Sequence, residues 1–146
     1  MTTIHKSALV HHSVEQMYQL VSDVEAYPKF LPWCGGSQIL SRDGDVVVAT
    51  VEIHYGAIHK PFTTRNTLIP HHAIEMSLVD GPFRTLQGGW QFQPLSPEAS
   101  KIILQLEFEF SSRVVAMTMG VVFNQITNSL VDAFVKHANK VYGKNG

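Results

Sequence analysis

The first residues of the chain show a change from strand-like to helix-like spacing of apolar positions. The stretch from Thr3 to Val10 is short and rich in Ile, Leu and Val, which predicts an opening strand. Ser13 is followed three residues later by Gln16, the spacing of a capping box. Apolar residues then recur at helical spacing, so we expect a helix that ends near Asp23.

A run of strands separated by turn signals occupies the middle of the chain, from Ser37 to Phe110. In its last member the apolar residues alternate strictly with Gln105, Glu107 and Glu109, which predicts one buried and one solvated face. The expected strands are Gln38–Ser41, Val46–Tyr55, Phe62–Ile69, Ala73–Val79, Phe83–Phe92 and Ser100–Phe110. We therefore expect an antiparallel meander of six or seven strands.

A long helix follows, capped by Ser111 or Ser112 and running from about Arg113 to Tyr142. At 1.5 Å per residue it is about 45 Å long, enough to cross a whole sheet. The order of elements predicts an α+β domain in which a curved antiparallel sheet wraps around the C-terminal helix, an arrangement that favours a cavity. Gly120 in the helix and Gly88-Gly89 in a strand each indicate either a close approach, a bend or a gap.

The segment from Tyr27 to Gly36 differs from an ordinary polar loop. It contains two prolines and two glycines, yet it also carries Tyr27, Phe30, Leu31 and Trp33. Several aromatic side chains in one loop indicate either that the loop packs on the core or that it contacts a ligand. Other aromatic residues fall on the elements expected around the cavity, and a pocket lined by them would suit a hydrophobic ligand.

Composition supports a globular chain and narrows its partners. With 146 residues we expect one domain over 1–146, and 45% hydrophobic against 16% charged residues excludes a disordered chain. The net charge of −1 disfavours strongly electrostatic binding to DNA or RNA. The single cysteine, Cys34, fits a reducing cytoplasm, and the apolar stretch Val114–Phe123 is shorter than the roughly 20 residues that span a bilayer. We expect a cytoplasmic protein without a membrane-spanning segment.

The sequence contains few signs of catalytic chemistry. The chain has no nucleophile elbow, phosphate loop or zinc-protease motif, and the pairs His11-His12 and His71-His72 lack metal-ligand spacing. Cys34 has no local nucleophile signature. Arg65 is the one cation of its strand and either orients a polar head group or lies at the surface. We expect no catalytic residues, no metal and no catalytic cofactor.

Several motifs, in this order, resemble one family. They are Tyr27-Pro28-x-Phe30-Leu31-Pro32-Trp33-Cys34, Asp80-Gly81-Pro82-Phe83, Gly89-Trp90-x-Phe92-x-Pro94-Leu95 and Gly120-x-x-Phe123. The chain thereby resembles the coenzyme Q-binding proteins of the START-like, polyketide cyclase/dehydrase superfamily, which include a bacterial ribosome association toxin branch. Thr63-Thr64-Arg65-Asn66 is most similar to that bacterial branch, and Trp33-Cys34 to the mitochondrial quinone-binding one.

The resemblance implies a helix-grip fold (START-like, Bet v 1-like) that binds ubiquinone without turnover, in support of respiratory electron transport. The Tyr27–Cys34 loop would form the rim of the cavity, and Thr64, Arg65 or Asn66 would bond the quinone oxygens, since alternation lets only one set face inward. The expected ligand-binding residues are Tyr27, Phe30, Leu31, Trp33, Thr64, Arg65, Asn66, Phe83, Trp90, Phe92, Phe108, Phe110, Met119, Phe123 and Ile126.

Two other functions stay open. The resemblance also implies a ribosome association toxin that binds the large ribosomal subunit and blocks formation of the 70S ribosome. The one basic cluster that could contact ribosomal RNA consists of Lys136, His137, Lys140 and Lys144. The superfamily name implies a cyclase or dehydrase, for which the sequence shows no acid–base pair. A quinone carrier would also need transient peripheral contact with the inner membrane.

Overall fold

The fold consists of seven strands, two α-helices and one 3-10 helix, which a computed structural model describes over residues 2–143. The elements are β1 (Thr2–Val10), α1 (Val14–Ser22), η1 (Val24–Lys29), β2 (Cys34–Asp43), β3 (Val46–Tyr55), β4 (Ile58–Ile69), β5 (Ala73–Asp80), β6 (Phe83–Ser96), β7 (Ala99–Phe110) and α2 (Arg113–Tyr142).

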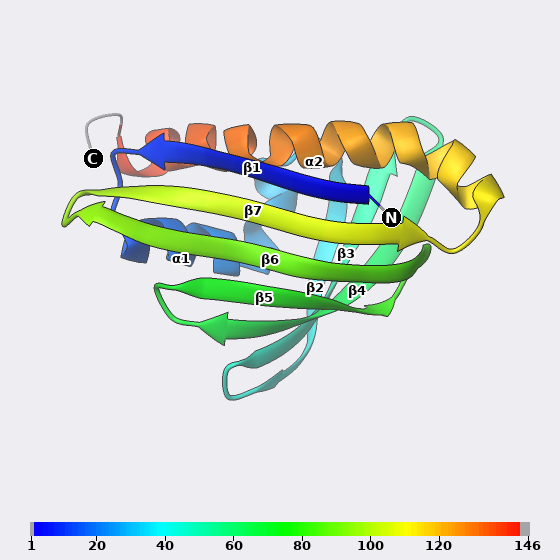
Figure 1. Cartoon of the computed structure of the whole chain (residues 1–146), viewed down its shortest axis with the longest axis horizontal. Coiled ribbons are helices and arrows are strands. Elements are labelled where there is room, and N and C mark those ends of the chain that lie inside the picture. Colours follow the sequence, from blue (N-terminus) through cyan, green and yellow to red (C-terminus); the bar gives the residue numbers. More distant parts are fainter. Residues whose placement is uncertain (1, 144–146) are drawn as a thin grey trace.

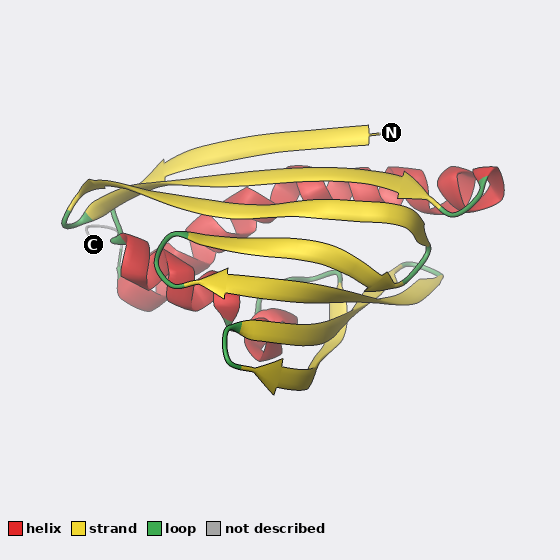
Figure 2. Cartoon of the chain, turned by 60° about the horizontal axis from the view of Figure 1, so that its bottom comes forward, coloured by secondary structure: helices red, strands yellow, loops and turns green. Residues whose placement is uncertain are grey.

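All seven strands form one antiparallel sheet in the order β1-β7-β6-β5-β4-β3-β2 (Figure 1). Figure 2 shows that the sheet curves and that α2 runs along one of its faces, with α1 and η1 on the same side. The predicted α+β fold, a curved antiparallel sheet on a long C-terminal helix, is confirmed.

Alternation along β7 explains how the sheet buries one face. Ile102, Leu104, Leu106 and Phe108 are at most 4% exposed, while Gln105 between them is exposed. The inward residues pack against buried residues of α2, including Met119, Phe123 and Phe134. The main hydrophobic core therefore lies between the sheet and α2, and a smaller cluster of Val24, Val47 and Ala49 lies between η1 and β3.

Both predicted helix starts are confirmed. The Ser13 side chain accepts a hydrogen bond from the Gln16 backbone N–H, and the Gln16 side chain accepts one from Ser13 N–H, which completes the capping box. At α2 the cap is Ser112, not Ser111, because the Ser112 hydroxyl accepts from Val115 N–H at 3.1 Å.

Several elements differ from the prediction in their type or their boundaries. Val24–Lys29 forms a 3-10 helix with Pro28 inside it, and β2 begins at Cys34 with a register shift before Gly36. β4 begins at Ile58, because Gly56 adopts the positive φ of a tight hairpin turn. β6 continues through Pro94, which lies beyond the last residue paired with β5, so the missing N–H breaks no ladder bond on that side.

The glycines of β6, Gly88 and Gly89, and the glycine of α2, Gly120, occur for opposite structural reasons. A Cβ on Gly88 or Gly89 would lie 2.1 Å from Gln105 O or 2.0 Å from Ile74 O, and both residues have positive φ. The strands therefore approach closely and bend there. A Cβ on Gly120 would meet nothing within 4 Å, so this glycine leaves open space and not a close approach.

By length and composition α2 could span a membrane, which the short stretch Val114–Phe123 did not indicate. Of its most apolar 18-residue window, 33% is buried in the fold. The inner side of α2 thus belongs to the core, while much of its apolar surface faces outward.

Candidate functional site

A cavity of about 90 Å³ lies between the inner face of the sheet and α2. Its walls are mostly apolar and aromatic, and they come from η1, from the loop before β2, from β3 to β7 and from α2. The lining residues are Val24, Tyr27, Trp33, Ala49, Val51, Phe62, Thr64, Asn66, Met76, Leu86, Trp90, Leu106, Phe123, Ile126, Thr127, Leu130 and Phe134.

Three polar side chains face this cavity. Thr64 and Asn66 are both 6% exposed and lie two residues apart on β4, so they share its inner face. The Thr64 hydroxyl donates to Asn66 Oδ1 at 2.9 Å, and Thr127 on α2 donates to Phe123 O at 2.9 Å. Among the described residues nothing accepts from the Asn66 amide nitrogen, so this donor is free for a ligand oxygen.

Tyr27 lines the cavity with its ring and not with its hydroxyl. The hydroxyl donates to Val21 O and so ties η1 to the end of α1. Burial, reinforced by the negative charge of Asp23, raises the pKa of Tyr27 far above its usual value. Tyr27 thus contributes an uncharged ring to the cavity wall, and its hydroxyl is already hydrogen-bonded.

The predicted ligand-binding residues divide into a lining set and a packing set. The cavity is lined by Tyr27, Trp33, Thr64, Asn66, Trp90, Phe123 and Ile126. Leu31, Phe83, Phe92, Phe108 and Met119 are buried in the core without lining it, and Phe110 is half-buried beside them. Phe83, Phe108, Phe110 and Phe123 form an aromatic cluster with centroid distances of 4.8 to 6.1 Å.

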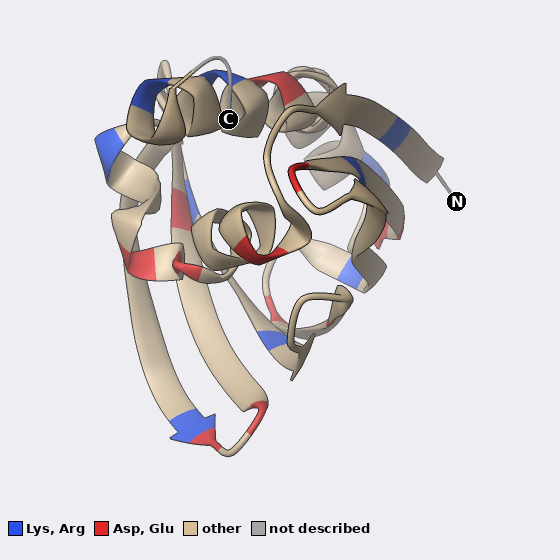
Figure 3. Cartoon of the chain, turned by 90° about the vertical axis from the view of Figure 1, so that its left-hand side faces the viewer, with Lys and Arg blue, Asp and Glu red and all other residues tan. Residues whose placement is uncertain are grey.

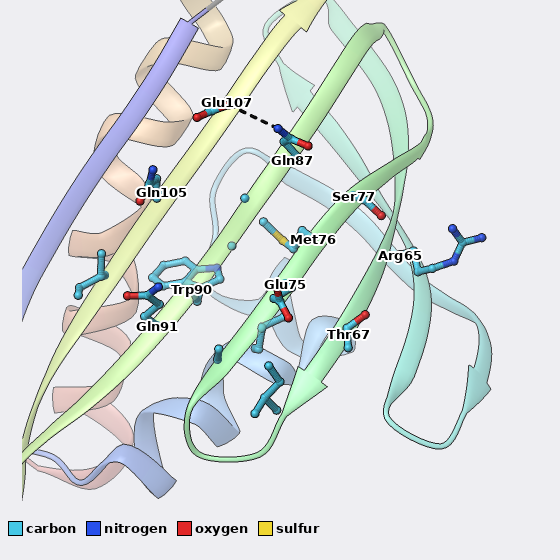
Figure 4. A pocket seen from close by; sticks show the side chains of 16 residues that line it. Arg65, Thr67, Glu75, Met76, Ser77, Gln87, Trp90, Gln91, Gln105 and Glu107 are labelled. Carbon is cyan, nitrogen blue, oxygen red and sulfur yellow. Dashed lines mark hydrogen bonds between the residues drawn. The ribbon is translucent and has the colours of Figure 1, made fainter.

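Arg65 does not face the cavity. It lies between Thr64 and Asn66 on β4, so alternation directs its side chain to the opposite face, where it is exposed. There it borders an outer hollow of about 710 Å³, whose lining mixes polar residues with apolar ones such as Met76 and Trp90 (Figure 4). In this outer hollow Gln87 Nε2 donates to Glu107 Oε2 at 3.4 Å.

Phe30 also lies outside the cavity. Its ring stacks on His137 of α2 with a centroid distance of 3.8 Å and an angle of 2°. Burial, together with the charge of Lys140, lowers the pKa of His137. The predicted basic cluster therefore contains Lys136 and Lys140 as its charged members, and Lys144 lies outside the described residues.

Figure 3 shows backbone positions of Lys and Arg interspersed with those of Asp and Glu at one end of the molecule. Cys34 is buried, and burial raises the pKa of its thiol, whose sulfur lies 3.3 Å from Gly36 O. A buried, protonated thiol is a poor nucleophile.

In the part of the chain that the structure describes, no group of three or more His, Cys, Asp or Glu side chains could hold a metal ion.

Several lining residues were not predicted. Phe134 packs edge-on against Trp90 at 5.3 Å, and Thr127 lies between Phe123 and Leu130 on the inner side of α2. Phe134 belongs to the helical apolar pattern, which assigns it to the core but not to the cavity. Thr127 is one turn from Phe123, and helical spacing would have placed it there.

Comparison with known proteins gives relatives of two kinds. The chain is 49% identical over 144 residues to a protein of Vibrio cholerae named "Ribosome association toxin RatA", covering 99% of this chain and 100% of that protein. It is 32% identical to "Coenzyme Q-binding protein COQ10 homolog B, mitochondrial" of Xenopus laevis, covering 95% of this chain and 59% of that protein.

Solved structures agree on the fold. The crystal structure of the Zhui aromatase/cyclase from Streptomyces sp. R1128 superposes with a TM-score of 0.85 at 15% identity, covering 95% of this chain and 94% of that chain. Residues 10–135 match the family described as "Polyketide cyclase / dehydrase and lipid transport". This chain belongs to that START-like family, as its motifs indicated.

Proposed function

We propose that this protein is a non-enzymatic binding protein that holds ubiquinone, or a closely similar polyprenyl quinone, with the quinone ring in the cavity. The observation that carries the proposal is the free Asn66 amide in an otherwise apolar, aromatic enclosure. A quinone is an apolar ring with carbonyl acceptors, which matches one donor in such walls. The relative named as a coenzyme Q-binding protein supports the same ligand class.

The size of the cavity sets a condition on this proposal. An apolar cavity of about 150 Å³ is known to admit benzene, so one of 90 Å³ takes a substituted ring only after its walls move apart. The remaining driving force comes from the isoprenoid tail, because each methylene removed from water contributes about 0.8 kcal/mol.

The lining chemistry supports binding over catalysis. Among the described lining residues Tyr27 is the one titratable side chain, and its hydroxyl is already bonded to Val21 O. General acid–base work needs a group that can exchange a proton with the substrate. We also propose that the protein is cytoplasmic and makes transient peripheral contact with a membrane surface, where it would take up its ligand.

The direct test is native mass spectrometry, with organic extraction, of protein purified from a quinone-containing host. We expect ubiquinone to co-purify, and the delipidated protein to bind added ubiquinone saturably. Val51→Phe fills the cavity and should abolish this binding, whereas Val48→Phe adds the same ring on the other face of β3 and should not. A folded, delipidated protein with no saturable quinone binding would contradict the proposal.

We also propose association with the ribosome, at its large subunit, as a second function. The name of the Vibrio cholerae relative, which this chain matches over 144 residues, supports association with the ribosome. The candidate contact is the C-terminal part of α2, where Lys136 and Lys140 are exposed and Lys29 adjoins the stacked Phe30. Cations there would meet RNA phosphates, so the association should weaken with added salt.

Co-sedimentation with purified large subunits over a range of salt concentrations tests this second function. The double variant Lys136→Glu and Lys140→Glu should lose co-sedimentation, while Lys101→Glu on β7 should retain it. Co-sedimentation of the double variant at the wild-type level would remove this surface as the contact.

A further inference from the structure

A groove of about 470 Å³ lies on the outside of the molecule, between the β3–β4 turn and α2. Figure 1 shows the ends of β3 and β4 reaching α2. The Tyr55 hydroxyl donates to Gln125 Oε1 and so joins the turn to the helix. Pro32, His54 and Ser129 complete the groove with Trp33 and Ile126.

Trp33 and Ile126 border both the groove and the cavity. Trp33 is 8% exposed and Ile126 is 4% exposed, so each fills the space between the two compartments. We call these two side chains the partition. The partition comprises the two residues that the linings of the cavity and the groove share.

The Trp33 side chain is held by packing and not by hydrogen bonds. Within residues 2–143 its indole nitrogen donates to no acceptor and its ring stacks on no other ring, whereas Trp90 packs edge-on against Phe134. The backbone of Trp33 is fixed, since its carbonyl accepts from His54 N–H at 2.7 Å. The indole can therefore change rotamer without breaking a hydrogen bond.

Beyond the groove, exposed apolar side chains follow the same row of α2. Ser129, Gln125, Val121 and Met117 are four residues apart, so they follow each other along the same side of the helix. Val121 is 66% exposed and Met117 is 76% exposed. An apolar chain that leaves the cavity past the partition would find the groove and then these side chains.

We propose that the ligand site has two compartments, with a quinone ring in the cavity and its apolar tail passing the partition into the groove beside Ser129. This inference rests on the proposed function. It assigns the Trp33 indole as the part that moves, and it assigns the groove as the site that distinguishes a tailed ligand from a tail-less one.

The experiment compares two probes on purified, delipidated protein: decylubiquinone, and 2,3-dimethoxy-5-methyl-1,4-benzoquinone, which has the same ring and no tail. Quenching of the tryptophan fluorescence reports binding of either. Ser129→Phe places a ring in the groove without touching the cavity, and Asn128→Phe adds the same ring at the neighbouring exposed position that does not line it. Thermal unfolding of each variant shows that it is folded.

In the wild type we expect decylubiquinone to bind at least about tenfold more tightly than the tail-less quinone, because its tail loses contact with water. Ser129→Phe should weaken the binding of decylubiquinone about tenfold and leave the binding of the tail-less quinone unchanged. Asn128→Phe should leave the affinity for both quinones unchanged. Undiminished binding of decylubiquinone by Ser129→Phe would overturn the groove assignment while the proposed function stands. A wild type that binds neither quinone would overturn both.

Discussion

Asn66 is the residue on which polar recognition in the cavity depends. Its oxygen is occupied by Thr64, which orients the amide so that its nitrogen is the available donor. A donor that has no partner among the described residues and lies in an apolar site favours a ligand that carries an acceptor, because their hydrogen bond offsets the cost of desolvation.

Replacing this side chain should affect the ligand more than the fold. Asn66→Leu removes the donor, and we expect about tenfold weaker binding of decylubiquinone, which corresponds to about 1.4 kcal/mol. Arg65→Leu on the outer face of the same strand is the matched control and should bind as the wild type does. Fluorescence titration measures both, and equal affinities for the two variants would remove Asn66 from the site.

Two glycines provide an opposite pair of stability predictions. Gly120→Ala should raise the free energy of unfolding by about 0.5–1 kcal/mol, because the position is helical and a Cβ meets nothing within 4 Å. Gly89→Ala should lower it by more than about 1 kcal/mol, because the Cβ would lie 2.0 Å from Ile74 O at a φ of +154°. Urea denaturation measures both, and a change of the same sign in the two variants would contradict this account.

At the scale of elements, η1 and the start of β2 place the aromatic loop over the cavity. The Tyr27 hydroxyl bonds to the last turn of α1, and the Trp33 carbonyl bonds to β3. The segment is therefore anchored at both ends, and the aromatic side chains of the two anchor residues, Tyr27 and Trp33, line the cavity, whereas Phe30 between them does not.

The Tyr27 anchor should be sensitive to alkali. Tyr27→Phe leaves the Val21 carbonyl unpaired, so we expect a loss of about 1 kcal/mol at neutral pH. The folded-state pKa of Tyr27 lies above the value of 10.0 that applies to the unfolded chain, so its contribution is complete below pH 10 and declines as the pH rises beyond it. The stability difference between wild type and Tyr27→Phe should therefore shrink above pH 10 in urea titrations. A constant difference from neutral to alkaline pH would show that the hydroxyl is not protected.

Much of the fold could be predicted at this scale, and the reasons are local. The alternation in β7 and the serine caps of both helices depend on near neighbours in sequence, and these predictions are confirmed. The boundaries of the cavity could not be predicted in the same way. Phe108 and Phe123 both belong to the apolar pattern, yet Phe123 alone borders the cavity, because that depends on how the curved sheet meets α2. For Arg65, the sequence left the face of its strand open.

For the whole molecule, ligand binding and stability are linked. A ligand that binds the folded state adds about 2.7 kcal/mol when its concentration is 100 times its dissociation constant. Decylubiquinone should therefore raise the melting temperature by several degrees, with a shift that grows with its concentration. Val51→Phe should melt at the same temperature with and without the quinone, because its cavity is filled. An equal shift in that variant would place the binding elsewhere.

The pairing of β1 with β7 has a consequence for how the chain folds. Thr2 at the start of β1 pairs with Phe108, and just beyond the other end of this strand His12 Nε2 lies 2.9 Å from Asn139 Oδ1. During synthesis the first strand emerges long before its partner, so β1 can join the sheet only after β7, which ends at Phe110, has left the ribosome. Contacts between such distant parts of a sequence form slowly, since a long loop must close before they contribute. Until then β2 to β6 can pair as successive hairpins, and β1 stays an unpaired edge that chaperones would have to protect from association with other chains.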